Sequence, residues 1–188
     1  MRWIPFLIVA CVMIGLELGL KSGFALAGRP IAPSFVMVLA VVVAIGAPPR
    51  QAMWACLLLG LALDLTFDQP LGDGRGVVCV PGPYALGYLV AAQLTLAMRT
   101  LVFRKNPLTI ALVSVFASLV ANIVVVAFFT LRSMYDPVIW SASTELGYRF
   151  LSALYTGLLG LVLSPLFLLL NPVMGLTTGL HRKGIRRV

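Results

Sequence analysis

The sequence predicts an all-α integral membrane protein built from about six transmembrane helices. Of its 188 residues, 61% are hydrophobic and only 11% are charged, whereas soluble domains have roughly 45–50% apolar and about 25% charged residues. The apolar residues form runs close to the roughly 20 residues that cross a bilayer. These runs are apolar on every face, which favours helices over the alternating strands of a membrane barrel. This composition excludes a soluble enzyme, a secreted disulfide scaffold and a nucleic-acid-binding domain.

The first three helices are predicted from runs that charges and prolines bound. Residues 4–20 are apolar apart from Glu17, and residues 32–47 carry no charge. Residues 51–67 are apolar apart from Asp64. Most prolines fall at the edges of such runs, where a fixed φ angle and a missing N–H disturb a helix least.

The last three helices are predicted over 83–98, 107–131 and 147–170. The first two of these begin at a proline. The third opens near Arg149 and then carries no charge to its end.

The distribution of basic residues predicts the orientation of this single transmembrane domain, which covers 1–188. An even number of helices puts both termini on one side, and nine lysines and arginines fall on that side against five on the other. Because cytoplasmic loops carry the excess of basic residues, we expect a multi-pass protein of the cytoplasmic (inner) membrane. Both termini, including a basic tail at 181–188, would then be cytoplasmic. An alternative is that the first run is a signal peptide cleaved within 25–28, which would leave five spans.

Three aspartates, Asp64, Asp68 and Asp73, form an acidic cluster after the third run. A spacing of four puts Asp64 and Asp68 on one helical face if the third helix continues that far, and paired carboxylates can hold Mg²⁺. However, Pro70 and Gly72 end the helix early, and no histidine or Gly-rich phosphate loop accompanies the cluster. We therefore expect no catalytic residue, no metal and no cofactor here, with a metal or catalytic site as the alternative.

Charged residues inside apolar runs need a polar partner or access to the membrane surface. Asp64 is therefore a candidate for a buried polar contact at a helix junction, with snorkelling to the outer headgroups as the alternative. Glu17 can pair with Lys21, four residues later on the same helical face. Arg149 opens the last helix at the same outer level, so Glu17, Asp64 and Arg149 are candidates for one polar layer.

Small and weakly polar residues mark the faces on which membrane helices approach closely. We expect them to pack within the bundle, with a surface for another subunit as the alternative. The candidates for this helix-packing face are Gly15, Gly19, Ser114, Ser118, Ala121, Asn122, Gly157 and Gly160.

The stretch 60–72 resembles the signature of the bacterial rod shape-determining protein MreD family. Gly60 and Asp64 match a Gly-Leu-x-x-Asp-Leu motif that closes a span, and Pro70, Leu71 and Gly72 match the Pro-Leu-Gly that follows it. An Ala-Leu pair and a tyrosine at the start of the next run, the length of the chain and the short basic tail are also similar to that family.

The resemblance implies a six-helix fold similar to the substrate-binding membrane subunit of energy-coupling-factor vitamin transporters. It also implies a non-enzymatic scaffold in the cell-elongation (rod) complex, which supports cell shape and peptidoglycan synthesis. The partners implied by the resemblance are an MreC-like protein, the MreB filament, the glycan polymerase RodA and its transpeptidase. Membrane lipid is a further partner, expected from the apolar runs and the basic tail. The alternatives are a vitamin-binding transporter subunit or small carrier, and a lipid-modifying enzyme.

Overall fold

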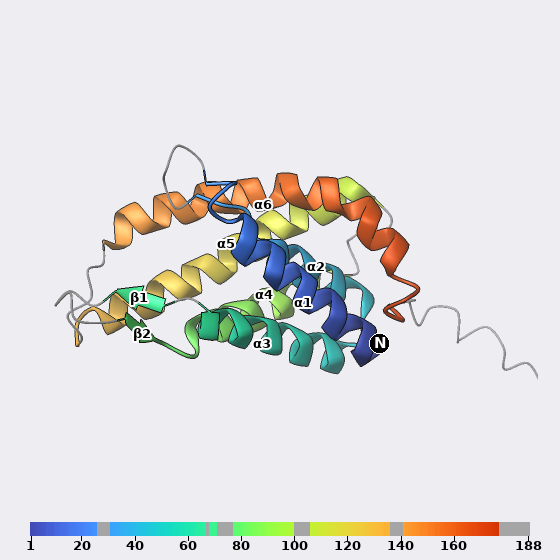
Figure 1. Ribbon diagram of the computed structural model, residues 1–188, viewed down its shortest axis with the longest axis horizontal. Helices are drawn as coiled ribbons and strands as arrows, with labels where there is room; N and C mark the ends of the chain where they lie inside the picture. Colours follow the sequence, from blue (N-terminus) through green and yellow to red (C-terminus); the bar gives the residue numbers. More distant parts are fainter. Residues whose placement is uncertain (26–30, 67, 71–76, 100–105, 136–140, 177–188) are drawn as a thin grey trace, which may run out of the picture.

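The computed structural model describes residues 1–25, 31–66, 68–70, 77–99, 106–135 and 141–176. This part of the chain is helical apart from its loops and one short hairpin (Figure 1). Its elements, in order, are α1 (Trp3–Leu20), α2 (Phe35–Gly46), α3 (Pro49–Thr66), β1 (Asp68–Pro70), β2 (Val77–Cys79), α4 (Pro83–Met98), α5 (Pro107–Arg132) and α6 (Ala142–Leu170).

Three of the helices, α1, α5 and α6, are long and apolar enough to cross a membrane. The helices α2 and α4 are apolar but shorter. At 1.5 Å per residue, the 12 residues of α2 cover only about 18 Å. Within the described residues, length and composition alone therefore identify three candidate spans, in keeping with an all-α membrane protein.

The predicted helix boundaries need two corrections. The sixth helix begins at Ala142 rather than at 147, because polar residues before Arg149 continue the helix instead of forming a loop. The second begins at Phe35 rather than at 32, because Ser34 caps it by accepting a hydrogen bond from the Met37 N–H.

A short antiparallel hairpin follows α3, and sequence analysis does not predict it. Asp68 in β1 pairs with Cys79 in β2. Because α3 ends at Thr66, Asp68 does not continue that helix, so the condition under which Asp64 and Asp68 would share a helical face is not met. Leu71, Gly72, Asp73 and the predicted tail at 181–188 lie outside the described residues.

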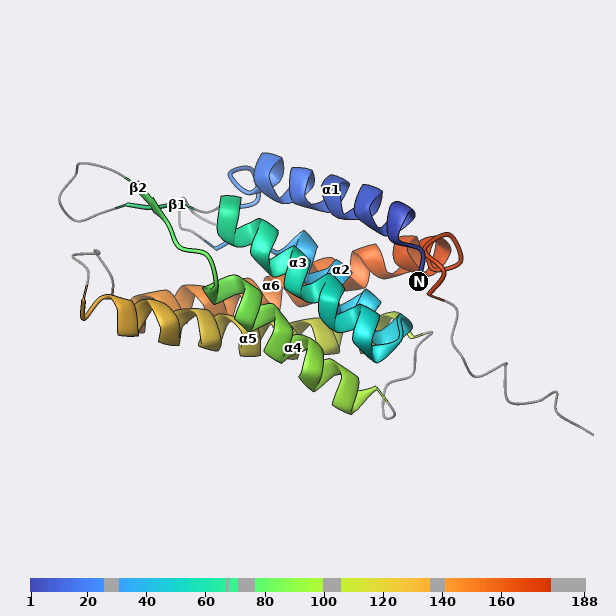
Figure 2. The same cartoon turned by 90° about the horizontal axis from the view of Figure 1, so that it is seen from below.

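The helices run alternately up and down the bundle, so their ends gather at two levels (Figures 1 and 2). At the end that holds the N-terminus, the Arg2 N–H donates to the Met174 carbonyl at 2.9 Å. At the same end, Arg99 Nη1 donates to the Ala47 carbonyl at 2.8 Å and ties α4 to α2. The hairpin lies at the opposite end. We call these the terminal end and the hairpin end.

The helix α2 forms the centre of the bundle. It contacts α1, α3, α4, α5 and α6, and every residue from Phe35 to Ile45 is buried. A helix that is apolar on all faces and enclosed by protein has no polar surface to present. Its shortness is therefore compatible with a membrane setting, because its backbone ends meet protein groups rather than lipid.

A proline inside α6 is compensated by its neighbour. Pro165 has no N–H to donate to the carbonyl of Leu161, four residues earlier. The buried Ser164 hydroxyl donates to that carbonyl at 2.9 Å. The helix therefore continues to Leu170.

Candidate functional site

The carboxylate of Asp64 caps the start of α4 from a neighbouring helix. Its Oδ2 accepts hydrogen bonds from the N–H groups of Gly82 and Ala85, and its Oδ1 accepts one from Tyr84, all at 2.9 Å. The N-cap residue of α4 is Gly82, with a φ of 129° and no side chain to offer, and Pro83 has no N–H. Asp64 thus satisfies donors that a helix N-terminus otherwise leaves unpaired.

Burial shows that this contact belongs to the interior. Asp64 is only 2% exposed, so it lies at a helix junction instead of reaching towards the surface. Negative charge at a helix N-terminus is electrostatically favourable, which offsets the cost of enclosing a carboxylate.

Gly60 brings α4 close enough for this capping. It lies one turn before Asp64, and a Cβ on Gly60 would stand 2.6 Å from both the Ala85 Cα and the Tyr84 carbonyl oxygen. Any larger side chain would therefore push the backbone of α4 away from α3. The glycine and the aspartate of the 60–72 motif act on the same turn of α4.

A second set of contacts links this turn of α4 to α5 and α6. Arg149 Nη2 donates to Tyr84 Oη at 3.3 Å, and its guanidinium lies 5.7 Å from the Tyr84 ring centroid. Arg149 Nη1 donates to Asn122 Oδ1 at 3.3 Å, and Arg149 Nε lies 3.7 Å from Glu145 Oε2. Asn122 in turn donates to the Arg149 carbonyl at 3.4 Å and to Ser118 Oγ at 3.3 Å.

The other acidic candidate, Glu17, caps the start of α2. It is 7% exposed, and its Oε2 accepts the Val36 N–H at 2.9 Å. The Ser34 hydroxyl donates to the same carboxylate, at 3.1 Å to Oε1 and 3.0 Å to Oε2. Burial lowers the pKa of the Lys21 amine, whereas the Glu17 carboxylate raises it and Arg149 lowers it.

Ser34 is the centre of this second group. Its hydroxyl hydrogen goes to Glu17, so its oxygen accepts from the Met37 N–H at 3.1 Å and from the Tyr88 hydroxyl at 3.3 Å. The Ser34 N–H donates to Thr156 Oγ1 at 3.0 Å. Thr156 completes the chain by donating to a carbonyl one turn earlier in α6.

Together the two groups join all six helices near the hairpin end. The Asp64 group connects α3, α4, α5 and α6, and the Ser34 group connects α1, α2, α4 and α6. Both groups include a tyrosine of α4, Tyr84 and Tyr88, one turn apart. The predicted layer of Glu17, Asp64 and Arg149 therefore consists of two groups linked through α4.

The chemistry available at these groups is that of hydrogen bonding. Asp64 accepts three backbone donors, and Glu17 accepts a backbone donor and a hydroxyl. Among the described residues, no three histidine, cysteine or acidic side chains gather as metal ligands.

The packing candidates divide into two sets. Those of α5 and α6 pack within the bundle: Ser114, Ser118 and Ala121 are buried, and Gly160 lies against Ser114. A Cβ on Gly157 would collide with the side chain of Val115.

The two glycines of α1 do not pack within the bundle, and that expectation is wrong for them. A Cβ on Gly15 or Gly19 would meet nothing within 4 Å in the described chain. The inner face of α1 is formed instead by Phe6, Ala10 and Met13.

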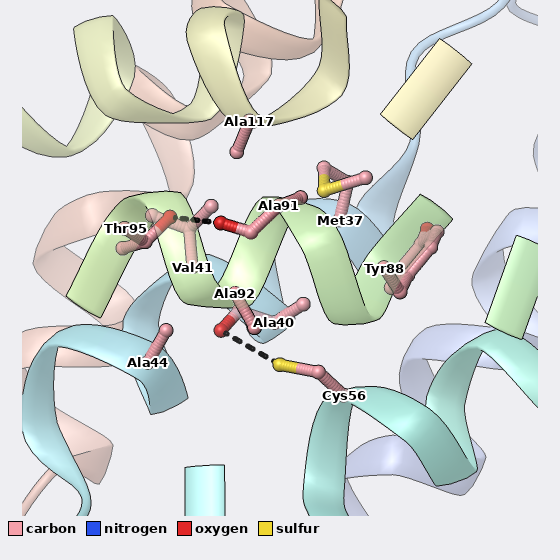
Figure 3. A pocket seen from close by; sticks show the side chains of 10 residues that line it. All are labelled: Met37, Ala40, Val41, Ala44, Cys56, Tyr88, Ala91, Ala92, Thr95 and Ala117. Atoms are coloured by element: carbon pink, nitrogen blue, oxygen red, sulfur yellow. Dashed lines mark hydrogen bonds between the residues drawn. The ribbon is translucent and has the colours of Figure 1, made fainter. Parts of the chain in front are cut away.

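A small gap lies between α2, α3, α4 and α5 (Figure 3). It leaves essentially no space for even a water-sized molecule, whereas pockets that hold small molecules measure roughly 300–1,000 Å³. Alanines line much of it, and its polar atoms are already used inside the protein. Cys56 Sγ donates to the Ala40 carbonyl at 3.7 Å, and Thr95 Oγ1 donates to the Ala91 carbonyl at 2.8 Å.

Sequence reasoning missed four residues of the polar groups: Ser34, Tyr84, Tyr88 and Thr156. A serine between a proline and an apolar run is a recognisable N-cap signal, so Ser34 could have been found. Tyr88 stood out only through the family resemblance, and Tyr84 and Thr156 carry no local signal, because their partners lie on other helices.

Comparisons with protein-family models, with curated proteins and with solved structures find no match. The fold and the two polar groups therefore carry the functional argument.

Proposed function

We propose that the bundle is a six-span protein of the bacterial cytoplasmic membrane with both termini in the cytoplasm. Arg2 and Arg99 are tied into the terminal end by hydrogen bonds, and Arg50 lies on the first turn of α3 at that end. The charge bias towards the cytoplasm supports this orientation. The complete enclosure of α2 supports counting it among the spans in spite of its length.

We infer that the protein acts as a non-enzymatic scaffold of the rod complex, supporting cell shape and peptidoglycan synthesis. The observation that carries this proposal is the use of Asp64. The acidic residue of the 60–72 motif is buried and accepts three backbone N–H groups, so its role is to hold α3 against α4. A motif with an architectural function favours a scaffold over an enzyme.

The partners proposed for this scaffold follow from the resemblance of the 60–72 motif. They are an MreC-like protein, MreB, RodA and a transpeptidase, with membrane lipid around the bundle. Close packing and a few polar contacts drive association between membrane helices. Exposed apolar side chains run along α1, α5 and α6, and these faces meet lipid or partner spans in this proposal.

Purification of the tagged protein in mild detergent tests the role. We expect an MreC-like protein to co-purify, and we expect depletion of the protein to round the cells. Recovery of a tightly bound vitamin-sized molecule, with unchanged cell shape on depletion, would instead establish a transporter subunit and refute the scaffold.

Labelling of the native cysteines tests the orientation separately. Cys79 belongs to the hairpin and should react with an impermeant thiol reagent in intact spheroplasts. Cys56 is 1% exposed and Cys11 lies on the outer face of a proposed span, so both should react only after detergent is added. Reaction of Cys79 only from the cytoplasmic side would reverse the orientation.

A further inference from the structure

The helix α1 is attached to the bundle along one face, on which partly buried Val9, Ile14 and Leu16 flank the fully buried residues. It packs mainly on α2, through Phe6, Ala10, Met13 and Glu17. The spacing of four, three and four residues puts these side chains on a single face. On other sides of α1, an added Cβ at Gly15 or Gly19 would have no neighbour within 4 Å in the described chain.

The polar ties of α1 lie near its two ends. At the terminal end, the Arg2 N–H donates to the Met174 carbonyl. Near the hairpin end, the Glu17 carboxylate accepts the Val36 N–H and the Ser34 hydroxyl. Because both of these donors belong to the start of α2, one carboxylate holds α1 in place and caps the central helix.

In the α3–α4 pair, as in the α1–α2 pair, a carboxylate near the end of one helix caps the start of the next. The two pairs differ in how closely their backbones approach. Glu17 lies three residues before the end of α1, and Asp64 lies two residues before the end of α3. Each carboxylate caps the helix that follows. At α3–α4, however, Gly60 brings the two backbones into close contact, whereas the glycines within α1 make no such contact with the described part of the chain.

We propose that Glu17 is a latch that holds α1 as a separable arm of the bundle. With the latch closed, α1 covers one flank of α2. With the latch open, α1 separates and uncovers apolar side chains of α2 that are otherwise fully buried. Docking of α1 thus controls access to the central helix.

Distance measurements between spin labels test the latch. The labels are attached at Val12→Cys on α1 and Leu158→Cys on α6, both exposed positions, in a chain whose native cysteines are replaced by alanine. In lipid nanodiscs, the protein with Glu17 intact should give one narrow distance distribution. Glu17→Ala should give a broad distribution that extends to longer distances. A narrow, unchanged distribution in Glu17→Ala would overturn the proposal.

The matched control is Glu145→Ala, which removes an acidic side chain from α6 that is ion-paired to Arg149. This variant should keep the narrow distribution. Broadening of equal size in Glu145→Ala would show that loss of any acidic group at this end loosens α1, and would refute a specific role of Glu17.

A double variant separates holding α1 from capping α2. In Glu17→Ala/Ser34→Asp, the introduced aspartate is itself a strong N-cap and should restore hydrogen-exchange protection at Val36 and Met37. The α1 distances should stay broad, because the introduced carboxylate belongs to the start of α2 and does not tie α1. Return of the narrow distribution in the double variant would show that α1 follows the state of α2, and the latch would be wrong.

If Glu17→Ala does not fold, Glu17→Gln provides the test. The amide keeps one acceptor oxygen, so we expect a mixture of the narrow distribution and longer distances. A single narrow distribution in Glu17→Gln would contradict the latch.

Discussion

Asp64 accepts a hydrogen bond from the backbone N–H of Ala85, and a side chain on Gly60 would collide with the Cα of the same residue. The hydrogen bond from the Ala85 N–H to Asp64 Oδ2 measures 2.9 Å, and the Cβ position of Gly60 lies 2.6 Å from the Ala85 Cα. The close approach and the cap thus depend on each other. The distances explain why a glycine and an aspartate stand four residues apart at the end of α3.

Gly60→Ala is expected to destabilise the protein by about 1–3 kcal/mol, the usual cost of overpacking a filled interior. The reason is that the nearest atoms are backbone atoms of α4, which cannot turn aside. Thermal unfolding in detergent measures the effect. Gly19→Ala is the matched control, because its site is open and alanine favours a helix. Equal stability of the two variants would contradict the proposed close contact.

Asp64→Ala should cost several kcal/mol, since each buried donor left without a partner costs about 1–3 kcal/mol. Asp64→Asn should cost less, because the amide retains one oxygen that accepts hydrogen bonds. In the same unfolding assay, we expect stability to fall from the wild type to Asp64→Asn and further to Asp64→Ala. An Asn variant less stable than the Ala variant would show that the repulsion between the new NH₂ group and the helix N-terminus exceeds the value of the retained acceptor.

Leucine at Gly157 or Gly160 should lower the stability of the protein itself. Both glycines lie inside the α5–α6 interface, against Val115 and Ser114, so a leucine would force the two helices apart. We expect losses of more than about 2 kcal/mol, in the range seen for severe overpacking. Gly147→Leu, at an open site on the same helix, should unfold near the wild-type temperature. A Gly157→Leu variant that folds normally would indicate that α5 and α6 pack differently.

Arg149→Lys should destabilise the bundle although the charge is kept. A lysine cannot donate to Tyr84 Oη and Asn122 Oδ1 at once with the planar fork of a guanidinium, and its ammonium cannot keep both of these hydrogen bonds and the cation–π contact with the Tyr84 ring. The expected cost is about 1–2 kcal/mol, by the magnitude of such contacts. Arg50→Lys, at an exposed position, should leave the unfolding temperature unchanged. Equal effects of the two substitutions would argue against specific contacts of Arg149.

The helices were largely predictable because each is a run of mostly apolar residues bounded by charged residues or prolines. The 83–98 prediction has the bounds of α4, and the others differ by at most a few residues. The first residue of a helix was harder to predict where polar residues belong to the helix, as in α6 from Ala142. It was also harder where an N-cap residue precedes the helix, as Ser34 precedes α2.

The polar groups were only partly predictable, for a physical reason. A charge in an apolar run has to find a partner, so Asp64, Glu17 and Arg149 stand out in the sequence. Their partners cannot be recognised in the sequence, because tyrosine hydroxyls and backbone N–H groups become partners only when the helices pack. Gly15 and Gly19 show the converse, since a small-residue pattern marks a possible contact and does not say whether another helix fills it.

The claim that Asp64 acts only by holding α3 against α4 is tested most directly by measuring the folding and the function of Asp64 variants separately. Asp64→Ala and Asp64→Asn would be expressed in rod-shaped bacterial cells from which the gene for this protein has been deleted, and folded protein in the membrane would be measured beside cell shape. If Asp64 is architectural, shape should fail in proportion to the loss of folded protein, and raising the expression of Asp64→Asn should restore rods. Rounded cells at wild-type levels of folded Asp64→Ala protein would contradict the account, because Asp64 would then act beyond holding α3 to α4.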